Sequence, residues 1–417
     1  MPHNPVRVQA FGHATDAGDR MATPNPARLL VVDDVLENRE LLVRRLQRLG
    51  HTGIVTAGDG IEALAAIRAA AAPFDAVLLD VMMPRMSGVE VLEAMHADPA
   101  LSAIPVIMIS AATELDTVVR CIELGAEDYL PKPFNPTLLR ARLGTVLEKK
   151  RLRDEVRRQL DRLERELAEA RSQQLSMLPE DFPPPDPAHP VEVHAVMHPA
   201  REVGGDLYDC FVTTPGTLCL AVGDVSDKGM PAALFMARTR SLLRASALQT
   251  LAATGQPPTP SSLMAVVNEE LCKNNPGCMF VTLFLGFLDT RTGILSFANA
   301  GHLPPWHVPA TTPPAELPCK PGPPLGIIPG ARHRDYTATL AEGDALVVIT
   351  DGLPEMMDPS GAFYTMPRVA ADIASLAGAT PARIVTELAA RVLAFAAGAP
   401  QADDVTALAV RVGMRTK

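Results

Sequence analysis

One highly charged stretch, residues 148–174, most strongly constrains how this chain can fold. It reads EKKRLRDEVRRQLDRLERELAEARSQQ, and its apolar residues recur at steps of four and three, at Val156, Leu160, Leu163, Leu167 and Ala170. This spacing predicts a helix with a narrow apolar stripe, typical of a short coiled coil over residues 148–178. The alternative is a single solvated helix whose stripe packs against a neighbouring domain. In both cases the helix separates two differently patterned regions.

The composition limits the class of protein. With 417 residues, 47% of them hydrophobic, the chain can form two or more domains with ordinary cores. A net charge of −10 argues against general affinity for nucleic acid, and the six cysteines show no zinc-site spacing. No apolar run reaches the roughly 20 residues that span a bilayer, and residues 1–26 suggest a disordered tail without a signal peptide. We therefore expect a cytoplasmic protein that binds neither nucleic acid nor membranes.

Residues 27–147 contain apolar runs that alternate with helix-like stretches. The strand-like runs are RLLVVDD, AVLLDVM, PVIMISA and AEDYLPK, and segments such as NRELLVRRLQRLG and VEVLEAMHAD separate them. This alternation predicts an α/β doubly wound domain, with helices on both faces of a parallel sheet. Ligands bind at the carboxyl ends of the strands in such a sheet. The polar residues at these ends are Asp33, Asp34, Asp80, Ser110 and Lys132.

These five residues suit a phosphoryl group and a cation. Three clustered carboxylates repel one another, and a divalent cation together with the Lys132 ammonium would relieve that repulsion. Asp80 would act as the nucleophile, and Ser110 and Lys132 would hold the oxygens of the product. A single Asp would more often be a cap or turn residue, so the prediction depends on the joint pattern.

Residues 28–148 resemble the response regulator receiver domain, which has a flavodoxin-like fold. The matching motifs are VVDD, LLDVMMPRMSG, ISA and YLPKPF. The resemblance implies that a sensor histidine kinase is the partner that phosphorylates Asp80. It also implies a Mg2+ ion held by Asp34, Asp80, the backbone carbonyl of Met82 and, through water, Asp33. Tyr129 matches the aromatic residue whose rotation reports the phosphorylated state.

A Pro-rich break, PEDFPPPDPAHP, separates the charged helix from residues 191–414, which are patterned differently. Strand-like runs there include VEVHAVMHPA, TLCLAVGDV, DALVVITDG and DVTALAVRV, and helix-like stretches begin at Pro231, Pro260 and Pro381. This mixture predicts an α+β domain of stacked sheets flanked by helices.

The segment GDVSDKGMPAAL, residues 223–234, has the glycines and the lysine of a phosphate-binding loop but not its spacing. Gly223 lies five residues before Lys228, no hydroxyl residue follows the lysine, and Asp224 would repel phosphate. A carboxylate at a strand end indicates a cation instead. Further acids stand beside strands or glycines at Asp206, Asp351, Asp403 and Asp404. Each alone is a turn residue by default, but together they supply carboxylates for two hard cations roughly 4 Å apart.

Residues 191–413 resemble the PPM/PP2C serine/threonine phosphatases, a β-sandwich family, and specifically its SpoIIE/RsbU-like branch. The motifs VGGDLYD, GDVSDKGMPAAL, FANAGHLPP, VVITDGLPE and DDVT recur in the family's order. The resemblance implies two Mn2+ or Mg2+ ions contacted by Asp206, Asp224 and the backbone carbonyl of Val225. Asp351 and Asp403 would complete the site, with the adjacent Asp404 as the alternative to Asp403.

The sequence identifies the residues that would contact the phosphate less clearly than it identifies the metal ligands. Arg201 lies five residues before Asp206, the offset of the phosphate-binding arginine in eukaryotic-type relatives, and its guanidinium suits a phosphate dianion. Those relatives have a His where this chain has Ser226, so the acid for the leaving group is unassigned. It could be a water molecule or His302, although a structural role for His302 is at least as consistent with the sequence. Lys228 either attracts phosphate or is a solvated loop cation.

The order of the two regions predicts a two-component response regulator in which Asp80 phosphorylation controls a phosphoserine/phosphothreonine protein phosphatase. The expected substrate is a phosphorylated STAS anti-sigma-factor antagonist, and the expected assembly is a homodimer through residues 148–178. Phosphorylation would change that pairing and reposition the helix beginning at Pro231. The alternative is a non-catalytic module that sequesters an anti-sigma factor or another regulator. The cognate kinase, the direction of control and the physiological metal are open, and no helix-turn-helix pattern follows the receiver.

Overall fold

The computed structural model describes residues 27–111, 115–182 and 191–413. The tail expected over residues 1–26, and residues 183–190 of the Pro-rich break, lie outside the described residues. The chain divides into two compact units, the first ending at Asp161 and the second beginning at Arg162. In the described part of the chain, no helix is both long and apolar enough to cross a bilayer.

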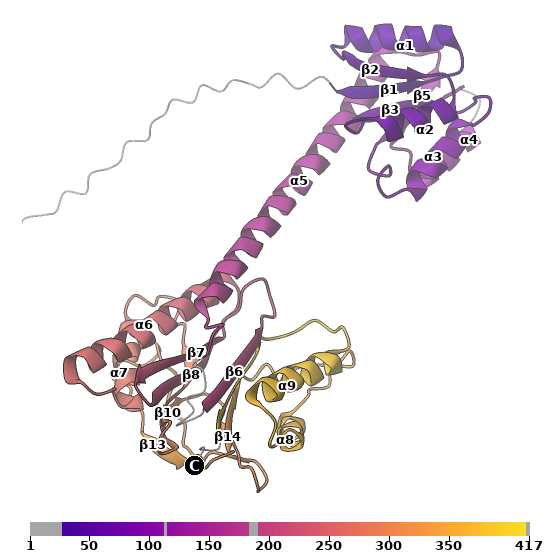
Figure 1. Cartoon of the computed structure of the whole chain (residues 1–417). Helices are drawn as coiled ribbons and strands as arrows, with labels where there is room; N and C mark the ends of the chain where they lie inside the picture. Colours follow the sequence, from indigo (N-terminus) through magenta and orange to yellow (C-terminus); the bar gives the residue numbers. More distant parts are fainter. Residues whose placement is uncertain (1–26, 112–114, 183–190, 414–417) are drawn as a thin grey trace, which may run out of the picture. The chain divides into compact units, whose positions relative to one another are not determined.

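The first unit is a parallel five-stranded sheet with helices on both faces (Figure 1). Its strand order is β2-β1-β3-β4-β5, which confirms the doubly wound fold expected from the sequence. The strands are β1 (Arg28–Val32), β2 (Gly53–Ala57), β3 (Ala76–Asp80), β4 (Val106–Ala111) and β5 (Asp128–Lys132). The helices between them are α1 (Leu36–Arg48), α2 (Gly60–Ala69), α3 (Gly88–Ala97) and α4 (Leu115–Glu123).

The strands of this sheet are apolar throughout because both of their faces are covered. In β1, Leu29 and Val31 pack with residues of α1, while Leu30 and Val32 pack with residues of α2 and α3 on the opposite face. All four side chains are fully buried. Alternate residues of a strand point to opposite faces, so a strand covered by helices on both sides reads as a continuous apolar run. The polar ends of β1, β3, β4 and β5 therefore stand out at one edge of the sheet.

A single 42-residue helix, α5 (Pro136–Met177), follows β5. Its first turns belong to the first unit, where Leu139 and Leu143 are buried in the core with α1. The apolar stripe predicted from the sequence lies farther along, and Val156, Leu160 and Leu163 are each more than half exposed. The helix begins well before the expected linker because no proline interrupts it between residues 137 and 177. Pairing of this stripe with a second chain stays a prediction.

The second unit is a sandwich of two antiparallel sheets. One sheet has the order β13-β10-β9-β8-β7 and the other β12-β11-β14-β15-β6. The first contains β7 (Leu207–Thr214), β8 (Thr217–Val225), β9 (Val281–Asp289), β10 (Ile294–Ala300) and β13 (Tyr336–Thr339). The second contains β6 (Val191–His198), β11 (Trp306–Val308), β12 (Ala315–Glu316), β14 (Ala345–Ile349) and β15 (Val405–Val412). The predicted sandwich flanked by helices is thereby confirmed.

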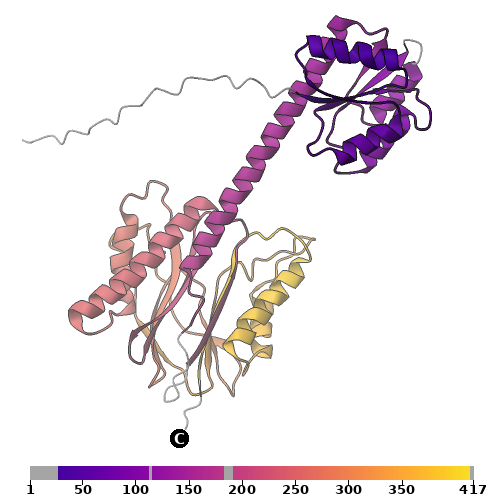
Figure 2. The same cartoon turned by 45° about the horizontal axis from the view of Figure 1, so that its top comes forward.

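Two pairs of helices cover the outer faces of the sandwich (Figures 1 and 2). Helices α6 (Met230–Thr254) and α7 (Pro260–Cys272) pack on the first sheet, and α8 (Met366–Ser375) and α9 (Pro381–Ala396) pack on the second. A third core lies between the sheets, with Phe284 and Phe297 of the first facing Leu346 and Leu408 of the second. The four layers thus bury both faces of β8, β9, β14 and β15, and the polar residues of these strands are confined to their ends.

Candidate functional site

The first unit gathers its acids around one lysine. Asp33 follows β1 and Asp80 ends β3, and the Nζ atom of Lys132 lies 2.9 Å from a carboxylate oxygen of each. Asp33 and Asp80 are buried, whereas Asp34 is exposed. Each of the three acids offers one carboxylate oxygen within 4.8 Å of the others. The structure therefore brings together the three acids and the lysine that the sequence placed at the carboxyl ends of the strands.

The charge of this cluster favours a cation. Burial raises the pKa of Asp80 to about 6, with Asp33 and Asp34 adding to the shift and Lys132 opposing it. Two of the three carboxylates already share the single ammonium, so the group retains excess negative charge. Hard oxygen donors of this kind are the ligands that Mg2+ takes in proteins. The donor set thus fits the Mg2+ ion that the sequence predicted, with Asp34 open to solvent on one side.

The other predicted receiver residues lie on the strands and loops of the same unit. Ser110 is buried near the end of β4, and Met82 is exposed two residues after Asp80. Gly88, which the sequence reasoning did not single out, begins α3 against the back of the site, where a Cβ atom would lie 2.0 Å from the carbonyl oxygen of Asp80. Only glycine permits that approach. Tyr129 of β5 is partly exposed, with the guanidinium carbon of Arg142 5.3 Å from its ring centroid.

In the second unit, the predicted metal acids lie at one end of the sandwich. Asp206 directly precedes β7 and Asp224 lies at the end of β8, and these strands pair with Leu207 opposite Gly223. Asp351 follows β14, and Asp403 and Asp404 precede β15, the neighbour of β14. In antiparallel pairs the start of one strand meets the end of the next. Residues from four separate sequence motifs therefore converge there.

Burial and mutual repulsion raise the pKa values of three of these carboxyl groups. The pKa of Asp206 is raised well above its usual range, first by burial and then by the charges of Asp224 and Asp404. Burial also raises the pKa of Asp224 to about 7 and that of Asp351 to about 6, again with neighbouring acids adding to the shift. Asp206 is fully buried and accepts a 2.8 Å hydrogen bond from the Thr350 hydroxyl. Divalent cations would relieve this repulsion, so the donor set fits metal ions.

This second group is more widely spread than the first. Within the described residues, only the group of Asp33, Asp34 and Asp80 places three ligand atoms within 4.8 Å of one another. A wider set of acids is compatible with two cations, roughly 4 Å apart, rather than one. The carbonyl oxygen of Val225 lies beside the loop that carries Asp206, because a Cβ atom on Gly205 would lie 3.0 Å from it.

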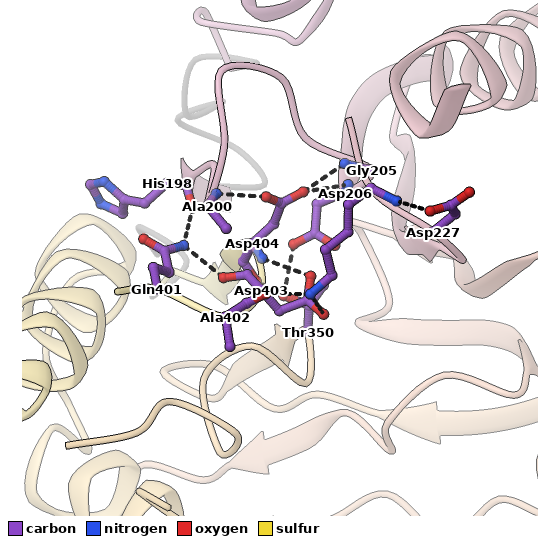
Figure 3. Close-up of polar contacts among 11 residues, drawn as sticks. His198, Ala200, Gly205, Asp206, Asp227, Thr350, Gln401, Ala402, Asp403 and Asp404 are labelled. Carbon is purple, nitrogen blue, oxygen red and sulfur yellow. Dashed lines mark hydrogen bonds and ion pairs between the residues drawn. The ribbon is translucent and has the colours of Figure 1, made fainter. Parts of the chain in front are cut away.

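Asp403 and Asp404, between which the sequence left the choice of metal ligand open, have different contacts (Figure 3). Asp404 is buried, and its Oδ1 accepts the N–H of Ala200 at 2.8 Å. Its Oδ2 accepts the N–H groups of Gly205 and Asp206 at 2.6 and 3.2 Å. Asp403 is partly exposed and, among the hydrogen bonds of the described residues, makes no such contact with this loop. Asp404 thus supports the loop that precedes β7, and the geometry favours Asp403 as the ligand.

Lys228 lies beside Asp403 rather than in open solvent. Its Nζ atom is 2.9 Å from Asp403 Oδ2 and donates to the carbonyl oxygen of Ala402. Both side chains of the ion pair are partly exposed, so solvent screens the attraction. The lysine therefore supplies one positive charge at the edge of the acid group. This charge opposes the upward shift of the pKa of Asp351.

The residues considered for contact with phosphate and the leaving group differ in exposure and in partners. Arg201 is exposed on the segment between β6 and β7. Ser226 exchanges backbone and side-chain hydrogen bonds with Phe280, each 2.9 Å long. His302 is 3% exposed, its Nδ1 lies 3.0 Å from the hydroxyl of Thr282, and burial lowers its pKa to about 4. A buried neutral imidazole of this kind favours the structural alternative for His302.

One buried ion pair was missed by the sequence reasoning. Asp209, the second acid of GGDLYD, is 1% exposed in β7 and contacts two arginines of α6, with oxygens 2.6 Å from Arg244 and 3.4 Å from Arg240. The only signal in the sequence was two arginines four residues apart in a helix. Asp209 ties the helix that follows the metal loop to the strand that follows Asp206.

Comparisons with known proteins match both units. The family model "Response regulator receiver domain" matches residues 29–144, and "Stage II sporulation protein E (SpoIIE)" matches residues 214–413. The chain is 28% identical to Protein IcfG of Synechocystis sp. over 284 residues, 61% of this chain and 42% of that protein. It is 38% identical over 125 residues to a probable transcriptional regulator, ycf27, of Cyanophora paradoxa, 30% of this chain and 50% of that protein. The chain thus spans half or less of these curated relatives.

Among solved structures, the SiaA-PP2C domain of Pseudomonas aeruginosa superposes with a TM-score of 0.52 at 20% identity. The match covers 60% of this chain and 98% of that domain. At this identity the likeness concerns the fold, a sandwich of antiparallel sheets flanked by helices.

Proposed function

Because this chain combines a response regulator receiver domain with a SpoIIE (PP2C-type) phosphatase domain, we propose that it is a metal-dependent protein phosphatase controlled by phosphorylation of Asp80. One observation carries the proposal. Asp206, Asp224, Asp351 and Asp403 converge at one end of the sandwich, with pKa values raised at the first three by burial and neighbouring acids. A surface that only binds another protein has no need of such a group.

The roles of the residues follow from their positions. Asp206, Asp224 and the Val225 carbonyl would hold the cations, and Asp351 and Asp403 would complete the site. When bound, the cations supply an activated water molecule and neutralise the charge of the phosphate. Of the two carboxylate oxygens of Asp403, Lys228 contacts only Oδ2 in the present arrangement.

We infer a phosphoserine or phosphothreonine substrate, carried by a STAS anti-sigma-factor antagonist. The likeness to the SpoIIE/RsbU-like phosphatases supports this class. The exposed guanidinium of Arg201, five residues before Asp206, can reach into solvent to hold a phosphate dianion by two parallel hydrogen bonds. Incubation of the purified protein with candidate phosphorylated STAS proteins, followed on phosphate-affinity gels, tests the substrate directly. Dephosphorylation of none of them would refute this assignment while leaving the enzyme class intact.

The enzyme class is tested with a small substrate. We expect Mn2+-dependent hydrolysis of p-nitrophenyl phosphate, and a loss of at least about 100-fold in Asp224→Asn, which keeps the size of the side chain but removes its charge. Asp227→Asn is the matched control, because Asp227 is exposed in the same loop. Hydrolysis that is absent from the wild type, or equal in the two variants, would favour the alternative of a non-catalytic module that sequesters an anti-sigma factor or other regulator.

Control by the receiver rests on Asp80. A sensor histidine kinase is the expected phosphoryl donor, and Mg2+ at Asp33, Asp34, Asp80 and the Met82 carbonyl is the expected cofactor. Ser110 and Lys132 would hold the phosphoryl oxygens, and Tyr129 would report the change. Beryllofluoride, which mimics the phosphoryl group, is expected to change the phosphatase rate of the wild type and not that of Asp80→Asn. Equal rates with and without it in the wild type would refute the control.

The apolar stripe of α5 supports a homodimer through residues 148–178. Val156, Leu160 and Leu163 are more than half exposed in the single chain, an arrangement that a second copy of the same helix would cover. Phosphorylation would then act through the pairing of two α5 helices.

A further inference from the structure

The end of α5 contacts the loop that carries Asp206. Gln174 is only 5% exposed, although it lies on a helix whose neighbouring residues Ser172 and Gln173 are both exposed. Its Nε2 donates to the carbonyl oxygen of Gly204 at 2.5 Å, and its Oε1 accepts the N–H of Gly204 at 3.0 Å. The carboxamide therefore satisfies both backbone groups of one residue, as a neighbouring strand would.

The same loop is held from its other side by Asp404. The Asp404 carboxylate accepts the N–H groups of Gly205 and Asp206, and it packs so closely on Gly204 that a Cβ atom there would lie 2.4 Å from Oδ2. Residues 204–206 are thus fixed between a carboxamide from α5 and a carboxylate from the segment before β15. The position of the Asp206 backbone depends on both.

The end of α5 is itself anchored in the phosphatase unit. Leu178 is buried in the core between the two sheets, and Leu175 packs against that core. The hydroxyl of Tyr208, two residues after Asp206, donates to the carbonyl oxygen of Pro179 at 3.3 Å. A helix advances about 1.5 Å per residue, so a shift by one residue would carry the Gln174 carboxamide out of hydrogen-bonding range of Gly204.

We propose that Gln174 is a positioning residue for the metal site: its carboxamide sets the place of Gly204, and through it the place of the Asp206 carboxylate. This inference rests on the proposed metal-dependent phosphatase function and adds a direct route from α5 to a metal ligand, separate from any movement of α6. Residues that orient metal ligands typically contribute about 10- to 100-fold to metal affinity.

The experiment uses the full-length protein and two readouts other than its activity. Gln174→Met removes both hydrogen bonds at similar volume, and Gln174→Asn keeps a carboxamide that is one methylene too short to reach Gly204. Gln173→Met is the matched control on the exposed side of the same turn. Mn2+ binding is measured by isothermal titration calorimetry and corrected for the binding that remains in Asp224→Asn, which reports on the receiver, and hydrogen exchange of residues 200–206 is measured without metal.

We expect both Gln174 variants to bind Mn2+ about 10- to 100-fold more weakly than the wild type and to exchange the amide of Gly204 faster, with Gln173→Met unchanged in both. Fluorescence of Trp306, which is buried in the second unit, verifies that each variant is folded. Wild-type Mn2+ affinity and exchange in a folded Gln174 variant would overturn the role of Gln174 alone. A wild-type chain that binds no more Mn2+ than Asp224→Asn would instead refute the proposed function.

Discussion

Replacing Asp404 by alanine tests whether this acid supports the metal loop rather than binding metal. The Asp404 carboxylate accepts the N–H groups of Ala200, Gly205 and Asp206, and Gly205 and Asp206 are buried. A buried N–H that loses its acceptor costs about 1–3 kcal/mol, so the two buried groups bound the effect at about 2–6 kcal/mol. Removal of a buried charge offsets part of this cost. We expect Asp404→Ala to lower the free energy of unfolding of the second unit by about 3–5 kcal/mol.

The chain offers a local probe for this measurement. Trp306 is its single tryptophan and is buried in β11, in the sheet that also contains β15. Urea unfolding followed by tryptophan fluorescence therefore reports on the second unit and not on the receiver. Metal-free buffer with a chelator keeps lost metal binding from contributing to the difference between variants.

Asp403→Ala is the matched control, one residue away. Asp403 is only partly buried and its ion pair with Lys228 is partly solvated, so we expect a change of no more than about 1 kcal/mol in unfolding and a loss of Mn2+ binding by the second unit. An Asp404→Ala chain as stable as the wild type, or an Asp403→Ala chain that is the less stable of the two, would refute the distinction drawn between these acids.

Three further predictions concern other parts of the chain. Asp209→Ala leaves the Arg244 guanidinium without its buried partner and should cost about 3 kcal/mol by tryptophan fluorescence; an unchanged midpoint would show that the pair is not needed. Gly88→Ala places a Cβ atom against the Asp80 carbonyl and should destabilise the receiver and weaken beryllofluoride binding, measured by circular dichroism and calorimetry; wild-type values would contradict that crowding. Leu163→Glu places a charge on the exposed stripe of α5 and should yield monomers in sedimentation velocity, whereas an intact dimer would place the interface elsewhere.

The architecture of both units was largely accessible from the sequence, for reasons that differ. In the receiver, strands buried on both faces read as unbroken apolar runs, and their polar ends marked the site. In the second unit, β8, β14 and β15 were recognisable for the same reason. Strand β7 (LYDCFVTT) was not predicted, because Asp209 and two threonines interrupt its apolar pattern. The partly buried arginines of α6 that compensate the charge of Asp209 lie some 30 residues away in the chain.

The roles of individual side chains were less accessible. A helix pattern placed Gln174 among charged and polar neighbours and offered no reason to expect burial. Its partner is the backbone of Gly204, 30 residues later. Nearly every residue has the same backbone N–H and C=O groups, so the sequence does not show which of them will be a partner. Likewise, nothing in the chemistry of two adjacent aspartates tells which one will face three N–H groups about 200 residues earlier in the chain.

The sequence by itself determined the two sets of acids, their places at strand ends and the classes of chemistry that such sets serve, because strand periodicity and residue type are local properties. Only the tertiary structure decided how those acids are held. It assigned Asp404 to the loop, left Asp403 beside Lys228, and joined Gln174 to Gly204. These choices depend on which backbone donors and acceptors the fold leaves without partners, and packing settles that only when distant segments meet.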